Sequence, residues 1–140
     1  AAIANGGTLY RPQLVREQGI LDQRTFMAEP EINGTFDVRP DVVAEVQSGL
    51  CQVTTEQYGT ASHIFRLPSP SPLLNIGVCA KTGTAESQVD IPHSWFAAYA
   101  PRDNPQIATI VMIETSGDGS AIAAPLTERI MEYFFFGPFD

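Results

Sequence analysis

Three apolar runs, separated by polar turns, dominate the second half of the chain. They span residues 76–86, 94–100 and 106–114, and each has the length of a strand. Only residues 101–105 separate the last two runs, and so short a connection predicts an antiparallel meander. Because residues 107–113 are almost continuously apolar, we expect the third strand to be central and covered on both faces.

Two further segments carry apolar residues at helical spacing. One begins at Pro40, a residue that suits the first position of a helix, and extends to about residue 53. The other lies near the C-terminus, where Pro125 is tolerated only in the first turn, and we expect it to pack on the sheet. The apolar positions that indicate these helices are Val42, Val43, Val46, Leu50 and Val53, then Ile122, Leu126, Ile130 and Tyr133 or Phe134. The pattern predicts an α+β fold, with an antiparallel sheet flanked by helices on both faces.

The first half of the chain has a weaker pattern. Residues 8–15 and 35–39 have the character of short strands, and we expect them to form a peripheral flap or ribbon. The Pro/Ser run at 67–72 predicts a surface connection. We therefore divide the chain into residues 1–72, with the flap, the first helix and a loop, and residues 73–140, with the meander and the C-terminal helix.

Charge and hydropathy exclude several classes of function. Eight Lys and Arg residues against sixteen Asp and Glu residues give a net charge of −8, so the chain lacks a basic footprint for nucleic acid or anionic lipid. It has neither an apolar run long enough to span a membrane nor the basic start of a signal peptide. The first residues end in Asn5-Gly6-Gly7, a pattern typical of the last turn of a helix, which leads us to expect a fragment of a larger domain.

The cysteines and histidines do not have the spacing of a metal site. Cys51 and Cys79 lie far apart in sequence, and neither His63 nor His93 is at ligand spacing from them. Two buried thiols are the favoured interpretation, and a disulfide in an oxidising compartment stays open. Adjacent strand residues face opposite ways, so His93 and Ser94 do not suggest a catalytic pair, and we expect His93 to make a structural hydrogen bond.

The chain contains one lysine, and its surroundings indicate an anion site. Lys81 opens the sequence Lys81-Thr82-Gly83-Thr84 on the first predicted strand of the meander. We expect its amine and the hydroxyls of Thr82 and Thr84 to face one way, where they could bind a peptide carboxylate. Gly83 leaves room for a substrate backbone to approach. The alternative is a lysine that merely protects a sheet edge from aggregation.

The same four residues carry a resemblance to a known family. Lys-Thr-Gly is the third signature of the penicillin-binding protein transpeptidases, and the chain most resembles the monofunctional class B kind. One departure is Ala80, where the family usually has glycine before the lysine. The family's other segments occur here in order, as residues 2–7 with 12–15, Gly59-Thr60-Ala61, Ala80–Glu86, His93–Pro101 and Ala123-Ala124-Pro125.

This resemblance implies a peptidoglycan D,D-transpeptidase that is inhibited by β-lactams, acts through an acyl-serine intermediate and needs no metal or organic cofactor. Lys81 would assist the serine of a Ser-x-Asn motif, and Thr82 and Thr84 would bind the carboxylate of the stem peptide or the β-lactam. The backbone N–H of Thr84 would donate to the oxyanion. Lys81 and Thr84 are thus the expected catalytic residues, with Thr82, Gly83 and Thr84 binding the substrate.

The nucleophile itself is missing from the chain. A Ser-x-x-Lys motif built on Lys81 would need serine at position 78, which is valine, and no serine is followed two residues later by asparagine. We therefore expect an N-terminal segment of the same domain to supply both motifs. The resemblance also implies that the protein acts outside the cytoplasm and is tethered to the cytoplasmic membrane through its N-terminal part. Alternatives are a β-lactamase or D,D-carboxypeptidase of the same fold, or a non-catalytic penicillin sensor or recognition module.

Overall fold

A three-stranded antiparallel sheet forms the centre of the structure, a computed structural model that describes residues 1–20, 23–88 and 90–138. Its strands are β5 (Cys79–Ala85), β6 (His93–Ala100) and β7 (Ile107–Ile113), in the order β5-β6-β7. This confirms the predicted meander. It corrects the placement of the third strand, because β7 lies at an edge of the described sheet and not at its centre.

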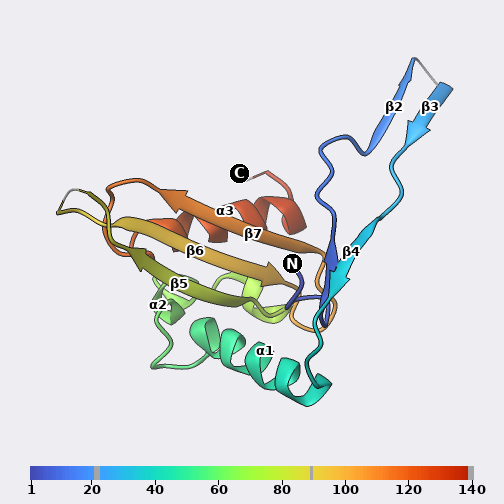
Figure 1. Cartoon of the computed structure of the whole chain (residues 1–140). Helices are drawn as coiled ribbons and strands as arrows, with labels where there is room; N and C mark the ends of the chain where they lie inside the picture. The colour runs from blue at the N-terminus through green and yellow to red at the C-terminus, as the bar shows by residue number, and fades with distance from the viewer. Residues whose placement is uncertain (21–22, 89, 139–140) are drawn as a thin grey trace.

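Helices pack against this sheet, as the predicted α+β fold requires, with α3 (Ala123–Phe136) behind the sheet and α1 (Pro40–Thr55) along its β5 edge (Figure 1). Helix α3 covers one face. Helix α1 packs beside β5 and reaches the second face, where Cys51 joins a buried cluster with Tyr99 and Leu50 packs against that cluster. Helix α1 leaves much of that second face open, and Ile110 of β7 is 72% exposed. The continuous apolar run of β7 therefore has one covered and one exposed side within the described residues.

The main core lies between α3 and the sheet. Phe96 and Met131 are fully buried there, together with Phe65 of the short helix α2 (Ser62–Arg66) and Leu73 of the 3-10 helix η1 (Pro72–Asn75). The buried residues of α3 are small apart from one methionine, namely Ala123, Ala124, Thr127 and Met131, and the partly buried Phe135 packs against the same core. The larger apolar stripe that predicted the helix is partly exposed, from Ile122 at 39% to Tyr133 at 59%.

The first forty residues form two small ribbons rather than one. Strand β1 (Thr8–Tyr10) pairs with β4 (Ile32–Thr35), and between them β2 (Glu17–Ile20) pairs with β3 (Gln23–Met27). Figure 1 shows the β2–β3 hairpin projecting from the body. The expected strand at 35–39 is wrong apart from its first residue, since the partner of β1 lies at 32–35. Residues 2–6 form the expected turn, closed by a hydrogen bond from the Gly7 N–H to the Ala2 carbonyl.

The two cysteines form a disulfide, which corrects the interpretation as two thiols. Cys51 on α1 and Cys79 on β5 are 28 residues apart in sequence, and the packing of the helix on the strand brings them together. Both are buried. Among the described residues, no helix is both long and apolar enough to cross a membrane.

Candidate active site

Strand β5 presents the four predicted site residues at the outside of the sheet. Within the described residues it pairs only with β6, in a register that sets Lys81 opposite Ala97 and Thr84 opposite Ser94. Lys81 and Thr84 are exposed, whereas Thr82 and Gly83 are partly buried. The motif therefore lies on an edge strand, where an extended peptide could add to the sheet.

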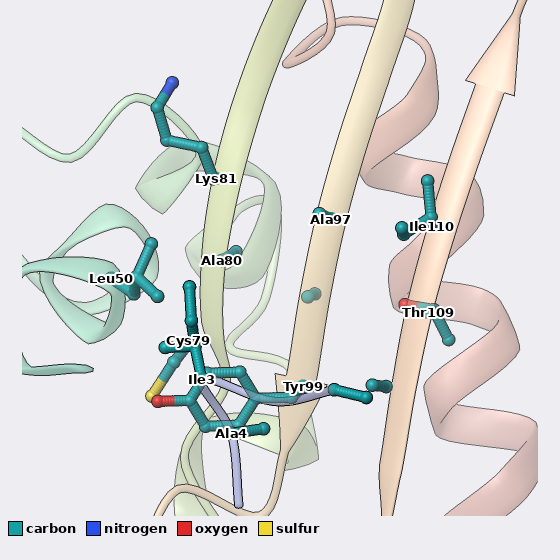
Figure 2. A pocket seen from close by; sticks show the side chains of 13 residues that line it. Ile3, Ala4, Leu50, Cys79, Ala80, Lys81, Ala97, Tyr99, Thr109 and Ile110 are labelled. Atoms are coloured by element: carbon teal, nitrogen blue, oxygen red, sulfur yellow. The ribbon is translucent and has the colours of Figure 1, made fainter. Parts of the chain in front are cut away.

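The lysine and the two hydroxyls do not share a face, which corrects the prediction that they point one way. Successive strand residues alternate between faces. Lys81 lies on the face of Tyr99 and Ile110 and lines a mainly apolar groove of about 390 Å³ on that side (Figure 2). Thr82 is paired with Phe96, whose side chain belongs to the core under α3. The Lys81 amine donates to the backbone carbonyl of Thr82.

Thr82 has a neighbour that sequence reasoning missed as a site residue. The Thr60 hydroxyl lies 3.1 Å from the Thr82 hydroxyl, and either oxygen can donate to the other. Thr60 precedes α2 and is 22 residues away in the chain. Its place in the Gly59-Thr60-Ala61 segment was the only signal in the sequence.

The loop between β7 and α3, residues 114–122, packs against the backbone of β5 and β6 beside the motif. A Cβ on Gly119 would lie far inside van der Waals contact of the backbone carbonyls of Gly83 and Trp95, so only glycine fits there. A Cβ added to Gly83 would lie 3.1 Å from the Cβ of Trp95. Gly119 therefore lets this loop approach β5 and β6 closely, whereas Gly83 leaves room for the Trp95 side chain.

Ser94 and His93 hold the same loop in place. The buried Ser94 hydroxyl donates to the Asp118 carbonyl over 3.0 Å and accepts from the N–H of Ala123, the first residue of α3, over 3.1 Å. His93 accepts from the Thr115 N–H through Nδ1 at 3.0 Å, which confirms the predicted structural role. Sequence reasoning missed the role of Ser94, because its partners are backbone groups more than twenty residues away.

Two groups near these elements have shifted pKa values. Hydrogen bonds from the hydroxyl and the backbone N–H of Ser120 lower the pKa of Asp118, so the loop carries a fixed negative charge near neutral pH. Burial raises the pKa of Tyr99, against a smaller opposing effect of Arg102, so its phenol stays neutral. Neither group lies on β5, and the cation on that strand is Lys81.

Comparisons with known proteins agree on one family. A model of the penicillin-binding protein transpeptidase domain matches residues 1–132. The peptidoglycan D,D-transpeptidase PbpA of Mycolicibacterium smegmatis is 31% identical over 137 residues, covering 90% of this chain and 26% of that protein. MrdA of Haemophilus influenzae, with the same activity in its name, is 50% identical over 152 residues, covering 94% and 22%.

Solved structures have the same fold. The imipenem acyl-enzyme complex of penicillin-binding protein A from M. tuberculosis superposes with a TM-score of 0.73 at 30% identity, covering 94% of this chain and 28% of that one. Penicillin-binding protein 2 of Pseudomonas aeruginosa, in complex with WCK 5153, gives 0.73 at 30% identity, covering 96% and 28%. The chain spans about a quarter of the length of the curated relatives it matches.

Proposed function

Since this chain belongs to the penicillin-binding protein transpeptidase family, we propose that it supplies the Lys-Thr-Gly strand of a peptidoglycan D,D-transpeptidase. The observation that carries the proposal is the position of Lys81-Thr82-Gly83-Thr84 on the exposed edge strand of a sheet with this family's fold. The whole chain then forms part of one transpeptidase domain, with residues 1–72 as flap, helix and loop and 73–140 as meander and C-terminal helix.

The reaction assigns each group on β5 a role. A serine hydroxyl attacks the carbonyl of a D-alanyl-D-alanine stem peptide, D-alanine leaves, and an acceptor amine then takes the acyl group and frees the serine. Lys81 supplies a positive charge beside the serine of the Ser-x-Asn motif, Thr82 and Thr84 donate to the terminal carboxylate, and the Thr84 N–H donates to the oxyanion. A β-lactam carries a carboxylate and a reactive carbonyl, so it binds the same groups.

The serine comes from another segment, which we propose lies upstream in the same polypeptide. Lys81 is the only lysine of this chain, so no Ser-x-x-Lys motif can be formed within it. The open face of the sheet supports an additional layer, since the groove beside Lys81 is lined by Ile3 and Ile110 and is mostly apolar. The relatives, about four times as long, have the chain length for such a layer.

The proposed location is outside the cytoplasm, with a tether to the cytoplasmic membrane in another part of the protein. The disulfide between Cys51 and Cys79 supports an extracytoplasmic site, because disulfides persist in oxidising compartments and are rare in the cytosol. The relatives' names, which refer to peptidoglycan, agree with this location.

Labelling of the full-length gene product with fluorescent penicillin tests the proposal. We expect covalent labelling of the wild-type protein, and labelling slowed by about 100-fold or more in Lys81→Ala, since removal of a comparable electrostatic group costs 10²–10³ in rate. Arg24→Ala is the control, because it removes one cation from the projecting hairpin. Equal labelling of all three proteins would contradict the role of Lys81.

Product analysis separates the transpeptidase from its alternatives. With a D-alanyl-D-alanine peptide and an acceptor amine, the proposal predicts release of D-alanine and formation of the cross-linked product. Stable labelling without D-alanine release would instead indicate a penicillin sensor. Rapid hydrolysis of penicillin would indicate a β-lactamase, and D-alanine release without cross-linking a carboxypeptidase.

A further inference from the structure

The hydroxyl contact between Thr60 and Thr82 leads to an inference that rests on the proposed function and adds a residue to it. We propose that Thr60 is a positioning residue, which orients the Thr82 hydroxyl toward the carboxylate of the bound peptide or β-lactam. The Oγ1–Oγ1 distance of 3.1 Å is a hydrogen bond between two residues far apart in sequence. Thr60 itself need not contact the ligand.

The backbone on both sides of Thr60 is fixed. Gly59 packs so closely on the end of α1 that a Cβ there would lie 2.5 Å from the Val53 carbonyl oxygen. Ala61 is fully buried, and its N–H donates to the same carbonyl over 3.1 Å. Backbone packing on both sides thus fixes the position of the Thr60 backbone, and its exposed side chain brings the hydroxyl to Thr82.

The end of α1 is in turn attached to the motif strand. Cys51 is bonded to Cys79, two residues before Lys81. One helical turn later, the buried Thr54 hydroxyl donates to the Val78 carbonyl. A closed path of contacts thus runs from β5 through α1 to Thr60 and back to Thr82. Such a path fixes the distance between the two hydroxyls more firmly than a loop contact alone.

The direction of the hydrogen bond follows from the ligand. A carboxylate only accepts, so Thr82 must donate its single proton to it. The oxygen of Thr82 is then free to accept from Thr60, and the two hydroxyls form a chain that ends on the anion. Donation from Thr60 holds the Thr82 proton outward and strengthens its bond to the carboxylate. Without Thr60, the Thr82 hydroxyl can rotate away.

Acylation by two forms of penicillin tests this role in the full-length gene product. Penicillin G carries the carboxylate, and its methyl ester does not. Thr60→Val keeps the side-chain shape and removes the hydroxyl. We expect it to raise the penicillin G concentration for half-maximal acylation about 2- to 10-fold and to leave the maximal rate unchanged. Acylation by the methyl ester should not change. Thr60→Ser should restore the wild-type constant, because it restores the donor.

The control is Thr25→Val, which removes an exposed threonine hydroxyl that donates to the Gln18 carbonyl on the projecting hairpin. It should leave both acylation reactions unchanged. An equal loss with penicillin G and the ester would overturn the inference, since a general distortion of the site affects both. Unchanged acylation in Thr60→Val would also overturn it. If the wild-type protein is not acylated at all, the proposed function fails instead.

Discussion

The disulfide between α1 and β5 should contribute strongly to the stability of the motif strand. The bond closes a loop with a sequence separation of 28 residues. In the chain-entropy treatment, a loop of this length stabilises the folded state by about 3–4 kcal/mol, because it restricts the unfolded chain. Replacing both cysteines with alanine, as in the double variant Cys51→Ala/Cys79→Ala, should remove that contribution. Alanine suits both sites, since both are buried.

Native-state hydrogen exchange of the full-length protein measures this effect where it acts. A loss of 3–4 kcal/mol in the opening free energy of β5 corresponds to a fall of roughly 100- to 1000-fold in the protection of its amides. We expect this fall in the double variant and also in the wild-type protein treated with a reductant under conditions that open the bond. Peptides from the β2–β3 hairpin, which lies outside the closed loop, should exchange as before.

The reduced wild-type protein is the decisive comparison, because it keeps both sulfur atoms in the core. If it retained the protection of the oxidised protein while the double variant lost it, packing of the sulfurs and not the cross-link would be the cause. Retention of full protection in both would refute the entropic reasoning altogether.

Three other changes should have measurable effects. Burial and the nearby charge of Glu132 raise the pKa of Glu128 in the folded protein. The protonated Glu128 carboxyl therefore contributes stability below its unfolded pKa of about 4.5, and this contribution is lost as the pH rises through the higher folded pKa. Glu128→Gln should therefore raise the melting temperature at pH 7 and leave it unchanged at pH 4. Gly59→Ala should lower the melting temperature and slow acylation, because its Cβ would collide with the last carbonyls of α1. Ser94→Ala should lower the free energy of unfolding in urea by about 1–3 kcal/mol, because it leaves the Ala123 N–H buried without its acceptor.

The periodicity of the chain predicted the elements better than their faces. The meander and both long helices are present, because the apolar runs and Pro40 are local signals. The packed side of α3 was not predicted, since the helix packs through Ala123, Ala124 and Thr127, whose small side chains allow a close approach to the sheet. A stripe of large apolar residues such as Ile130 then remains partly exposed. Hydrophobicity alone cannot distinguish these two sides.

The candidate site divides in the same way. The chemical types of Lys81, Thr82 and Thr84 were readable from the sequence, whereas the neighbours of these residues depend on contacts across the fold. Thr60 meets Thr82 from a different element. Cys51 meets Cys79 for the same reason, since only the packing of α1 on β5 brings them together. No local pattern contains that information.

The placement of Lys81 and Thr82 on opposite faces of β5 is compatible with one shared ligand. A peptide added to a sheet edge lies in the plane of the sheet, so side chains from both faces flank it. β5 is the outer strand of the described sheet. The Lys81 amine turns back to the carbonyl of Thr82, which brings the cation close to the backbone of the residue that carries the hydroxyl. A long lysine on one face and a short threonine on the other can therefore meet at the edge. In the proposed function, the edge rather than a common face lets Lys81 and Thr82 reach one extended anionic peptide.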